Sequence, residues 1–191
     1  MSHQKYDCSR LCVSTLLVVL LCSSFSSKGG ILCPFFPAKQ GWSVSAFDIS
    51  AEGRKKALRL AKDNQVSIDY QVGELTELDF SNNPFDAIAL IYAHFPSEVK
   101  SKYHKLMDSY LRKGGTIIFE AFGKNHLEYR SKNPYVGGPK NLDSLFSIEE
   151  IRGDFKDYEV LVLEEREVEL NEGKYHSGTG SVVRFAGRKR Y

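Results

Sequence analysis

The sequence has little cysteine, and what it has lies at one end. All four cysteines fall before residue 38, at Cys8, Cys12, Cys22 and Cys33. No pair of them has the Cys-x-x-Cys spacing of a zinc site, so we expect no bound metal. Residues 38–191 contain no cysteine and therefore no disulfide framework, which suits a reducing compartment. We accordingly expect a cytoplasmic protein.

The sequence also lacks an excess of charge of one sign. Its formal net charge is +2, with 42% hydrophobic and 26% charged residues, which is ordinary for a globular protein. A nucleic-acid-binding surface normally needs a concentration of lysine and arginine that this composition does not indicate. We expect no nucleic-acid partner and, for residues 38–191, no membrane partner. The composition leaves the oligomeric state open.

Long hydrophobic runs are absent as well. The apolar run at 11–21 is too short to span a bilayer comfortably. It follows Lys5 and Arg10 and precedes small residues, which is the outline of a signal peptide and would imply export. The composition changes abruptly at Ala38, which favours a second interpretation, an altered reading frame or start. We therefore divide the chain into an atypical segment, 1–37, and one domain, 38–191.

The domain is organised around residues 41–50. An apolar strand at 42–47 ends on Asp48, and Ser50 is a good N-cap for a helix at 51–64. A strand followed by an acid and a helix cap is typical of a nucleotide-binding βαβ unit. In such a unit the acid binds the ribose hydroxyls.

The rest of the domain continues the alternation of strands and helices. The run at 85–92 is apolar almost throughout, as in a strand buried on both faces of a parallel sheet. Ser147 and Glu150 have the spacing of a capping box. The short connection near the C-terminus indicates an antiparallel strand pair. The remaining predicted elements are strands at 67–72, 116–121, 158–169 and 180–188, a helix at 97–112 and a loop at 122–145.

These elements predict an α/β fold, Rossmann-like and doubly wound, with a mainly parallel sheet and an antiparallel C-terminal strand pair. The first βα unit is expected to be atypical or absent. In the segment 31–36, Pro34 interrupts the apolar residues, and proline is rarely found in a central strand. We therefore expect residues 1–37 not to form the central strand properly, and the chain to be marginally stable. The run at 11–21 is the other segment that could fill this position.

The order of motifs resembles the class I S-adenosylmethionine-dependent methyltransferases, particularly the small tellurite-resistance-type enzymes. The motifs are AFDIS at 46–50, VGEL at 72–75, FDAIALIYAHFP at 85–96, LRKGGTIIFEAF at 111–122 and GGPKNLDSLFSIEEI at 137–151. The resemblance implies an enzyme that uses S-adenosylmethionine to methylate an acceptor. A small-molecule acceptor is expected, because the lid is short and the surface lacks a basic stripe.

The resemblance also implies site residues. Asp48 would accept hydrogen bonds from the ribose hydroxyls. The other implied cofactor-binding residues are Ile49, Glu74 and Leu75 near the adenine, and Tyr92 and Ala93 near the methionine end. The implied substrate lid comprises Phe122, Tyr129, Tyr135, Gly137 and Gly138.

Histidines are the candidate proton-transfer groups. His94 follows a strand and could act as a base or contact the substrate. The alternative is that it only hydrogen-bonds the following loop. His104 lies on a charged stretch of a predicted helix, so we expect it at the surface. His126 and His176 are predicted in loops.

The sequence departs from the family where a glycine-rich loop should follow the first strand. The region offers only Gly29 and Gly30, without a preceding acid, although glycine is needed for close backbone approach to the cofactor. We therefore expect weak cofactor binding and impaired activity. Two alternatives stay open: an inactive remnant or binding module on the same scaffold, and an NAD(P)-dependent Rossmann enzyme.

Overall fold

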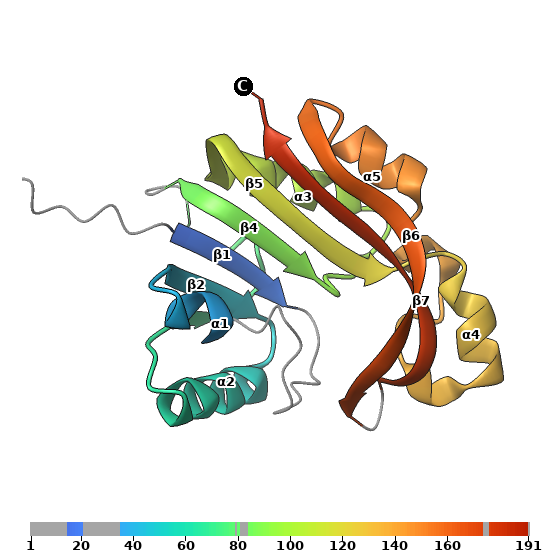
Figure 1. The fold of residues 1–191 in the computed structure, drawn as a ribbon, viewed down its shortest axis with the longest axis horizontal. Coiled ribbons are helices and arrows are strands. Elements are labelled where there is room, and N and C mark those ends of the chain that lie inside the picture. The colour runs from blue at the N-terminus through green and yellow to red at the C-terminus, as the bar shows by residue number, and fades with distance from the viewer. Residues whose placement is uncertain (1–14, 21–34, 79, 81–83, 174–175, 191) are drawn as a thin grey trace, which may run out of the picture.

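The structure of the protein is a computed structural model that describes residues 15–20, 35–78, 80, 84–173 and 176–190. Its centre is one seven-stranded sheet in the order β3-β2-β1-β4-β5-β7-β6 (Figure 1). The strands from β3 to β5 are parallel, and β7 runs antiparallel to both β5 and β6. The strands are β1 (Thr15–Leu20), β2 (Ser43–Asp48), β3 (Asp69–Val72), β4 (Phe85–Ile91), β5 (Leu111–Phe122), β6 (Tyr158–Gly173) and β7 (His176–Lys189).

The central position of the sheet is filled by β1, so the expectation that residues 1–37 would leave it without a proper strand is wrong. Val18 pairs with Ala46 on one side and with Ala89 on the other. The segment TLLVVL has the branched, apolar composition of a strand buried in a parallel sheet. It lies within the alternative run at 11–21. Without β1, the facing edges of β2 and β4 would have unpaired backbone N–H and C=O groups inside the protein. Such groups are costly, which explains why this apolar run pairs with both strands.

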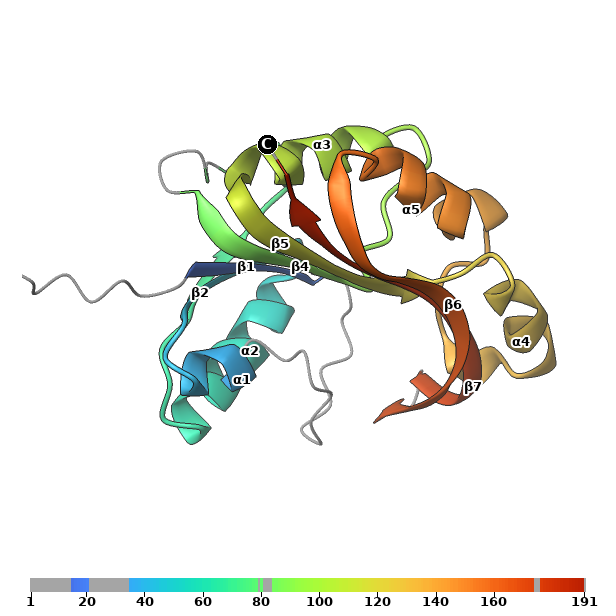
Figure 2. The same cartoon turned by 45° about the horizontal axis from the view of Figure 1, so that its top comes forward.

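Helices cover both faces of the sheet, and the two views agree on their arrangement (Figures 1 and 2). The helices α1 (Phe35–Lys39) and α2 (Ala51–Asp63) lie on one face. The helices α3 (Lys100–Tyr110) and α5 (Ile148–Asp154) lie on the other. The core is correspondingly divided, with Ala57 of α2 in one cluster and Met107 of α3 in the other. The predicted doubly wound fold with a mainly parallel sheet is confirmed.

The segment predicted as a loop at 122–145 contains structure of its own. It holds the helix α4 (His126–Lys132) and two 3₁₀ turns, η1 (Pro134–Val136) and η2 (Leu142–Ser144). The helix α4 lies beside the strongly curved β6–β7 hairpin (Figure 1). This places the predicted lid next to the carboxyl end of β5.

Serine caps explain where the helices α2 and α5 begin. The Ser50 hydroxyl accepts from the Gly53 N–H at 3.0 Å and starts α2. The predicted capping box is present, with Ser147 and Glu150 each accepting from the other's backbone N–H. Ser97, in contrast, does not start a helix directly, because a turn precedes α3 and the helix begins at Lys100.

His104 is buried, at 1% exposure, and the prediction of a surface histidine is wrong. It lies on the face of α3 that meets α5, where its Nδ1 is 2.6 Å from Asp154 Oδ2. Its ring also packs against Phe146 and Phe155. The charged neighbours of His104 in the sequence point elsewhere on the helix. A partner from α5, distant in sequence, makes burial of this polar side chain favourable.

Candidate functional site

The carboxyl ends of β1, β2 and β4 meet at the point where the strand order reverses. From β1 the chain builds outward through β2 and β3, and it then returns to the other side of β1 for β4 and β5. Leu20, the last residue of β1, is paired with Ile91, the last residue of β4. Open α/β sheets bind ligands outside the carboxyl ends of their strands at such a switch point. This end of the sheet is therefore the candidate ligand site.

Asp48 ends β2 at this point and is only 2% exposed. Its Oδ1 accepts from the Ser50 N–H at 3.2 Å, whereas its Oδ2 has no hydrogen-bond partner in the described part of the chain. Burial raises the pKa of this carboxyl, although hydrogen bonds from the backbone of Ser50 and Ile49 oppose the shift. A buried carboxylate oxygen without a partner is costly, and a bound ligand carrying hydroxyl groups would satisfy it.

Gly53 explains how the helix can approach Asp48 so closely. A Cβ placed on Gly53, in the first turn of α2, would lie 2.9 Å from Asp48 Oδ2. Any other residue there would push the carboxylate or the helix away. The small residue therefore helps to define the position of Asp48 at the end of β2.

Tyr70 is a candidate site residue that the sequence analysis did not predict. It pairs with Ala46 in the β2–β3 ladder, so its side chain is on the same face of the sheet as that of Asp48. Its hydroxyl is also buried without a partner among the described residues. Burial, and then the charge of Asp48, raise the pKa of the Tyr70 hydroxyl. Side chains two residues apart on a strand lie on the same face of the sheet. Tyr70 is two residues before Val72, the partner of Asp48, so this alternation could have identified Tyr70 from the sequence.

The residues expected near the adenine are divided between the rim and the core. Ile49, which directly follows the last residue of β2, is 59% exposed. Glu74, which is also exposed, follows the end of β3. The Gly73 N–H donates to the Asp48 carbonyl at 3.2 Å, which brings Glu74 to this end of the sheet. Leu75 is 2% exposed and packs in the core with Phe47 and Phe80.

The backbone turns sharply where β4 ends. Tyr92 has φ of +49°, a left-handed conformation that is uncommon for a residue with a side chain. Its N–H donates to the Glu120 carbonyl at 2.7 Å, and its ring packs on Phe122 at 4.8 Å between centroids. Ala93 is completely buried. Such strained positions cluster at functional sites, which supports the placement of the site at this end of β4.

His94 has both ring nitrogens engaged. Nδ1 lies 2.9 Å from the Ser144 carbonyl oxygen, and Nε2 lies 3.3 Å from the Phe122 backbone nitrogen. Because a carbonyl can only accept, Nδ1 carries the hydrogen and Nε2 accepts from the Phe122 N–H. Burial lowers the pKa of His94 to about 4, so the ring is neutral at neutral pH. This geometry corresponds to the loop-binding alternative, and action as a base would require exchange of one of these bonds.

Phe122 lies at the centre of a cluster of aromatic and imidazole rings. It stacks on His126 at 3.9 Å and on His94 at 5.6 Å, and it contacts His176 edge-on at 5.7 Å. Phe122 itself is 1% exposed. It therefore forms the floor beneath the carboxyl ends of β4 and β5 rather than a lid over them.

The predicted lid is anchored to the β6–β7 hairpin. His126, fully buried, donates from Nε2 to the Gly137 carbonyl at 3.1 Å and accepts at Nδ1 from the Ser181 N–H at 3.3 Å. Gly138 has φ of +79°, and a Cβ on it would lie 2.7 Å from the Phe122 ring. Two tyrosines complete the set: Tyr129 donates to Glu167 of β6, and Tyr135 is 55% exposed.

A cleft of about 280 Å³ opens beside the end of β4. One wall is the segment that joins β4 to α3, and the other is the segment around η2. The residues that line it are His94, Phe95, Pro96, Ser97, Glu98, Pro139, Asn141 and Ser144.

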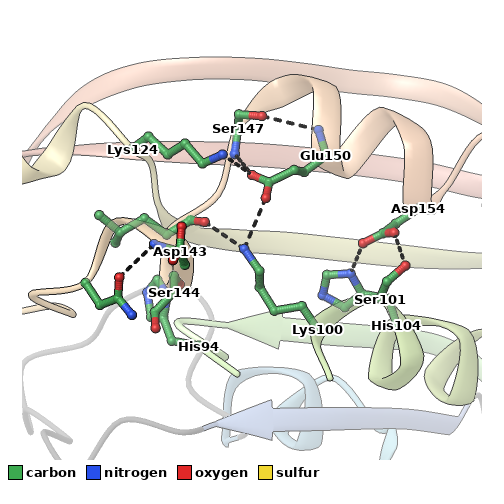
Figure 3. A network of polar contacts seen from close by, with 12 residues as sticks. His94, Lys100, Ser101, His104, Lys124, Asp143, Ser144, Ser147, Glu150 and Asp154 are labelled. Atoms are coloured by element: carbon green, nitrogen blue, oxygen red, sulfur yellow. Dashed lines mark hydrogen bonds and ion pairs between the residues drawn. The ribbon is translucent and has the colours of Figure 1, made fainter. Parts of the chain in front are cut away.

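A polar network fixes the wall of the cleft (Figure 3). Lys100, 7% exposed, donates from Nζ to the Leu145 carbonyl at 2.9 Å and to Glu150 Oε1 at 3.2 Å. The other carboxylate oxygen of Glu150 is 3.1 Å from Lys124 Nζ. His94 and Lys100 thus hold the consecutive carbonyls of Ser144 and Leu145 from one side.

The described residues contain no group of three or more histidine, cysteine, aspartate or glutamate side chains arranged to hold a metal ion. None of the described helices is long and apolar enough to cross a membrane.

Comparison with known proteins identifies the architecture. A family model described as a methyltransferase domain matches residues 28–115. A search of curated proteins finds no match. Among solved structures, TehB from Haemophilus influenzae is similar with a TM-score of 0.65 and 13% identity, over 94% of this chain and 59% of that one. This chain therefore spans less than two thirds of the TehB chain.

Two other solved structures show the same fold. The N-methyltransferase NodS from Bradyrhizobium japonicum has a TM-score of 0.62 at 12% identity, over 94% of this chain and 87% of that one. An S-adenosylmethionine-dependent methyltransferase from Clostridium acetobutylicum has a TM-score of 0.61 at 12% identity, over 93% of this chain and 85% of that one. At these identities the likeness is one of fold.

Proposed function

We propose that the chain is a class I methyltransferase and that it transfers a methyl group from S-adenosylmethionine to a small-molecule acceptor. The match to a methyltransferase domain over residues 28–115 and the similarity in fold to solved methyltransferases support this proposal. The observation that carries the proposal is the unpartnered Oδ2 of Asp48, buried at the switch point of the sheet. A ribose hydroxyl pair supplies the donors that this oxygen lacks.

The proposed cofactor site follows the strand ends. Asp48 accepts from the ribose hydroxyls. Ile49 and Glu74, on the rim beside it, adjoin the adenine, and Leu75 supports that side from the core. Tyr92 and Ala93, at the end of β4, are placed next to the methionine end. Tyr70, whose buried hydroxyl also lacks a partner among the described residues, is added to this set.

The chemistry itself is supplied by the sulfonium of the cofactor, whose methyl group is open to in-line displacement. The protein contributes binding, orientation and exclusion of water. A dedicated catalytic base is therefore not required. The neutral, doubly hydrogen-bonded His94 fits a positioning role at the end of β4.

We further propose that the chain binds its cofactor weakly. The only glycines in the sequence between β1 and α1 are Gly29 and Gly30. A loop without the family's glycine pattern allows fewer close backbone contacts to the methionine part of a ligand. The missing glycine pattern also favours the second candidate, an inactive scaffold.

Calorimetric titration of the full chain with S-adenosylmethionine, S-adenosylhomocysteine and NAD tests the proposal. We expect weak binding of the two sulfur compounds and none of NAD. Asp48→Ala should weaken binding by about 1.5–3 kcal/mol, or roughly 10- to 150-fold, because a hydrogen bond to a charged group is lost. Asp69→Ala, which removes an exposed carboxylate from β3, is the matched control and should leave the affinity unchanged.

Three outcomes contradict the proposal. Preferential binding of NAD would indicate the nicotinamide-dependent class. No binding of any of the three compounds would indicate the inactive scaffold. Equal affinity in the Asp48→Ala variant and the wild type would remove Asp48 from the cofactor site.

A further inference from the structure

The cleft between the β4–α3 segment and the η2 segment has the location and size of a small-ligand site. Its volume of about 280 Å³ is just below the usual range for ligand pockets, about 300–1,000 Å³, so only a small ligand would fit. It begins at His94, three residues after the end of β4, and therefore adjoins the switch point where the cofactor is proposed to bind. A ligand in it would be a small molecule rather than a polymer.

The lining of the cleft carries one kind of charge. Glu98 is its one carboxylate, and the eight lining residues include neither lysine nor arginine. Hydrogen bonds from its own backbone N–H and from Ser97 lower the pKa of Glu98, so the carboxylate is ionised at neutral pH. His94 is neutral there because burial lowers its pKa to about 4. The cleft therefore presents a negative charge without a cation in its lining.

Two lysines adjoin the cleft without lining it, and burial together with the charge of Lys100 lowers the pKa of His94. Lys100 is buried and engaged with the Leu145 carbonyl and with Glu150. Lys140 is exposed and does not line the cleft, although its neighbours Pro139 and Asn141 do. Within the lining itself, an anionic ligand would meet only the like charge of Glu98, whereas a cationic ligand would find an acceptor.

The walls are held in place before any ligand binds. His94 and Lys100 hold the carbonyls of Ser144 and Leu145, as the close-up shows (Figure 3). Pro96 on one wall and Pro139 on the other restrict the backbone further. A site organised in advance loses less conformational entropy on binding, which favours a small ligand with few contacts.

We propose that this cleft is the methyl-acceptor site and that it takes a small amine, drawn to Glu98 by its positive or hydrogen-bonding nitrogen. The proposal rests on the proposed function. In the transfer, a ligand bound as an ammonium ion first loses a proton to water. The lone pair of the uncharged amine then attacks the methyl carbon and forms the C–N bond. The C–S bond breaks with its electron pair going to sulfur, so S-adenosylhomocysteine is released. The nitrogen then loses its proton to water.

The test uses three probes of nearly the same shape and different charge: tyramine, 4-hydroxyphenylacetate and tyrosol. Their binding to the full chain is measured by ligand-observed NMR without cofactor, so that the result does not depend on cofactor binding. We expect tyramine to bind about 5- to 20-fold more tightly than the acid, with the neutral alcohol between them, as expected for one carboxylate at a partly exposed site.

Glu98→Gln keeps the shape and removes the charge. It should weaken tyramine binding by about 3- to 10-fold and abolish the preference over tyrosol. Glu149→Gln is a close control, because Glu149 is also exposed and also bonded to its own N–H and to a preceding serine, but it does not line the cleft. This variant should bind tyramine as the wild type does.

The proposal is overturned if the acid binds as well as tyramine, if Glu98→Gln has no effect, or if no probe binds at millimolar concentration. S-adenosylmethionine is titrated separately into the same variants. Amine binding without cofactor binding would support the cleft as an amine site and reject the methyltransferase function. Cofactor binding without amine selectivity would support the methyltransferase function and reject the cleft as an amine site.

Discussion

The imidazole of His94 accepts a hydrogen bond from the backbone N–H of Phe122, with 3.3 Å between the two nitrogens. The two residues follow or end adjacent parallel strands, β4 and β5, and their rings are also stacked at 5.6 Å. The other ring nitrogen holds the Ser144 carbonyl. One side chain thus connects two strand ends and the wall of the cleft.

Replacing His94 by leucine should destabilise the protein. The variant keeps an apolar side chain next to Phe122 but leaves the Phe122 N–H and the Ser144 carbonyl without their partner. A buried polar group left unsatisfied costs about 1–3 kcal/mol. Urea unfolding at pH 7 measures the loss, and an unchanged free energy of unfolding would show that water replaces both bonds.

The same variant should alter the pH dependence of stability. The pKa of His94 is lowered from 6.5 to about 4 by burial, so the unfolded state binds the proton more readily. The wild type should therefore lose stability as the pH falls from 6.5 towards 4. His126, whose pKa burial also lowers, contributes in the same direction. His94→Leu should accordingly show a smaller slope over this interval, and the full wild-type slope in the variant would argue against a neutral buried His94.

Asp48→Asn should raise stability at neutral pH while weakening cofactor binding. Burial raises the pKa of Asp48, so the folded state binds the proton more readily than the unfolded state. Wild-type stability due to this group is greatest below the ordinary pKa and falls as the pH rises to the elevated value. The uncharged amide in the Asp48→Asn variant avoids the free-energy cost of burying a carboxylate. Thermal unfolding at pH 7 should show a higher Tm than the wild type, with Asp69→Asn unchanged; a lower Tm would mean that the charge is stabilised in the folded protein.

Val18→Pro should unfold the protein or destabilise it severely. Val18 lies in the middle of β1, between Ala46 and Ala89, and proline removes a ladder hydrogen bond and clashes with the neighbouring backbone. The expected cost is about 3 kcal/mol or more. Thr15→Pro, at the first residue of the strand, should cost much less. Circular dichroism melting of the two variants compares them, and equal melting would show that β1 does not complete the sheet.

Gly138→Ala should destabilise the docked α4–η1 segment. Gly138 has a positive φ, and a Cβ would lie 2.7 Å from Phe122 and 3.1 Å from His126. We expect a loss of about 1–3 kcal/mol, since the strained backbone and the packed rings must both adjust. Gly153→Ala, in α5 with no atom within 4 Å of the new Cβ, should instead gain about 0.5–1 kcal/mol. The difference in Tm between the two alanine variants checks the prediction, and a similar Tm would contradict it.

Local patterns in the sequence were sufficient for most of the elements. The apolar run at β4, the Ser50 cap before α2 and the Ser147 capping box before α5 each depend on residues within a few positions of one another. The antiparallel pair β6–β7 follows from two long strands with a short connection. Such features are encoded locally, because propensity and capping act within one or two turns of the chain.

The contents of the core and the site were decided only by the tertiary structure. The run at β1 was recognisable as apolar, but its central place depends on the unpaired edges of β2 and β4. The charged stretch around His104 predicts a surface residue, whereas in the fold its ring is buried against Asp154 of α5 and Phe155. The hydrogen-bonding state of His94 and the unsatisfied oxygen of Asp48 likewise depend on groups from other elements, or on their absence among the described residues. Periodicity identifies which face of an element is apolar, whereas only the assembled fold determines which distant side chains meet that face.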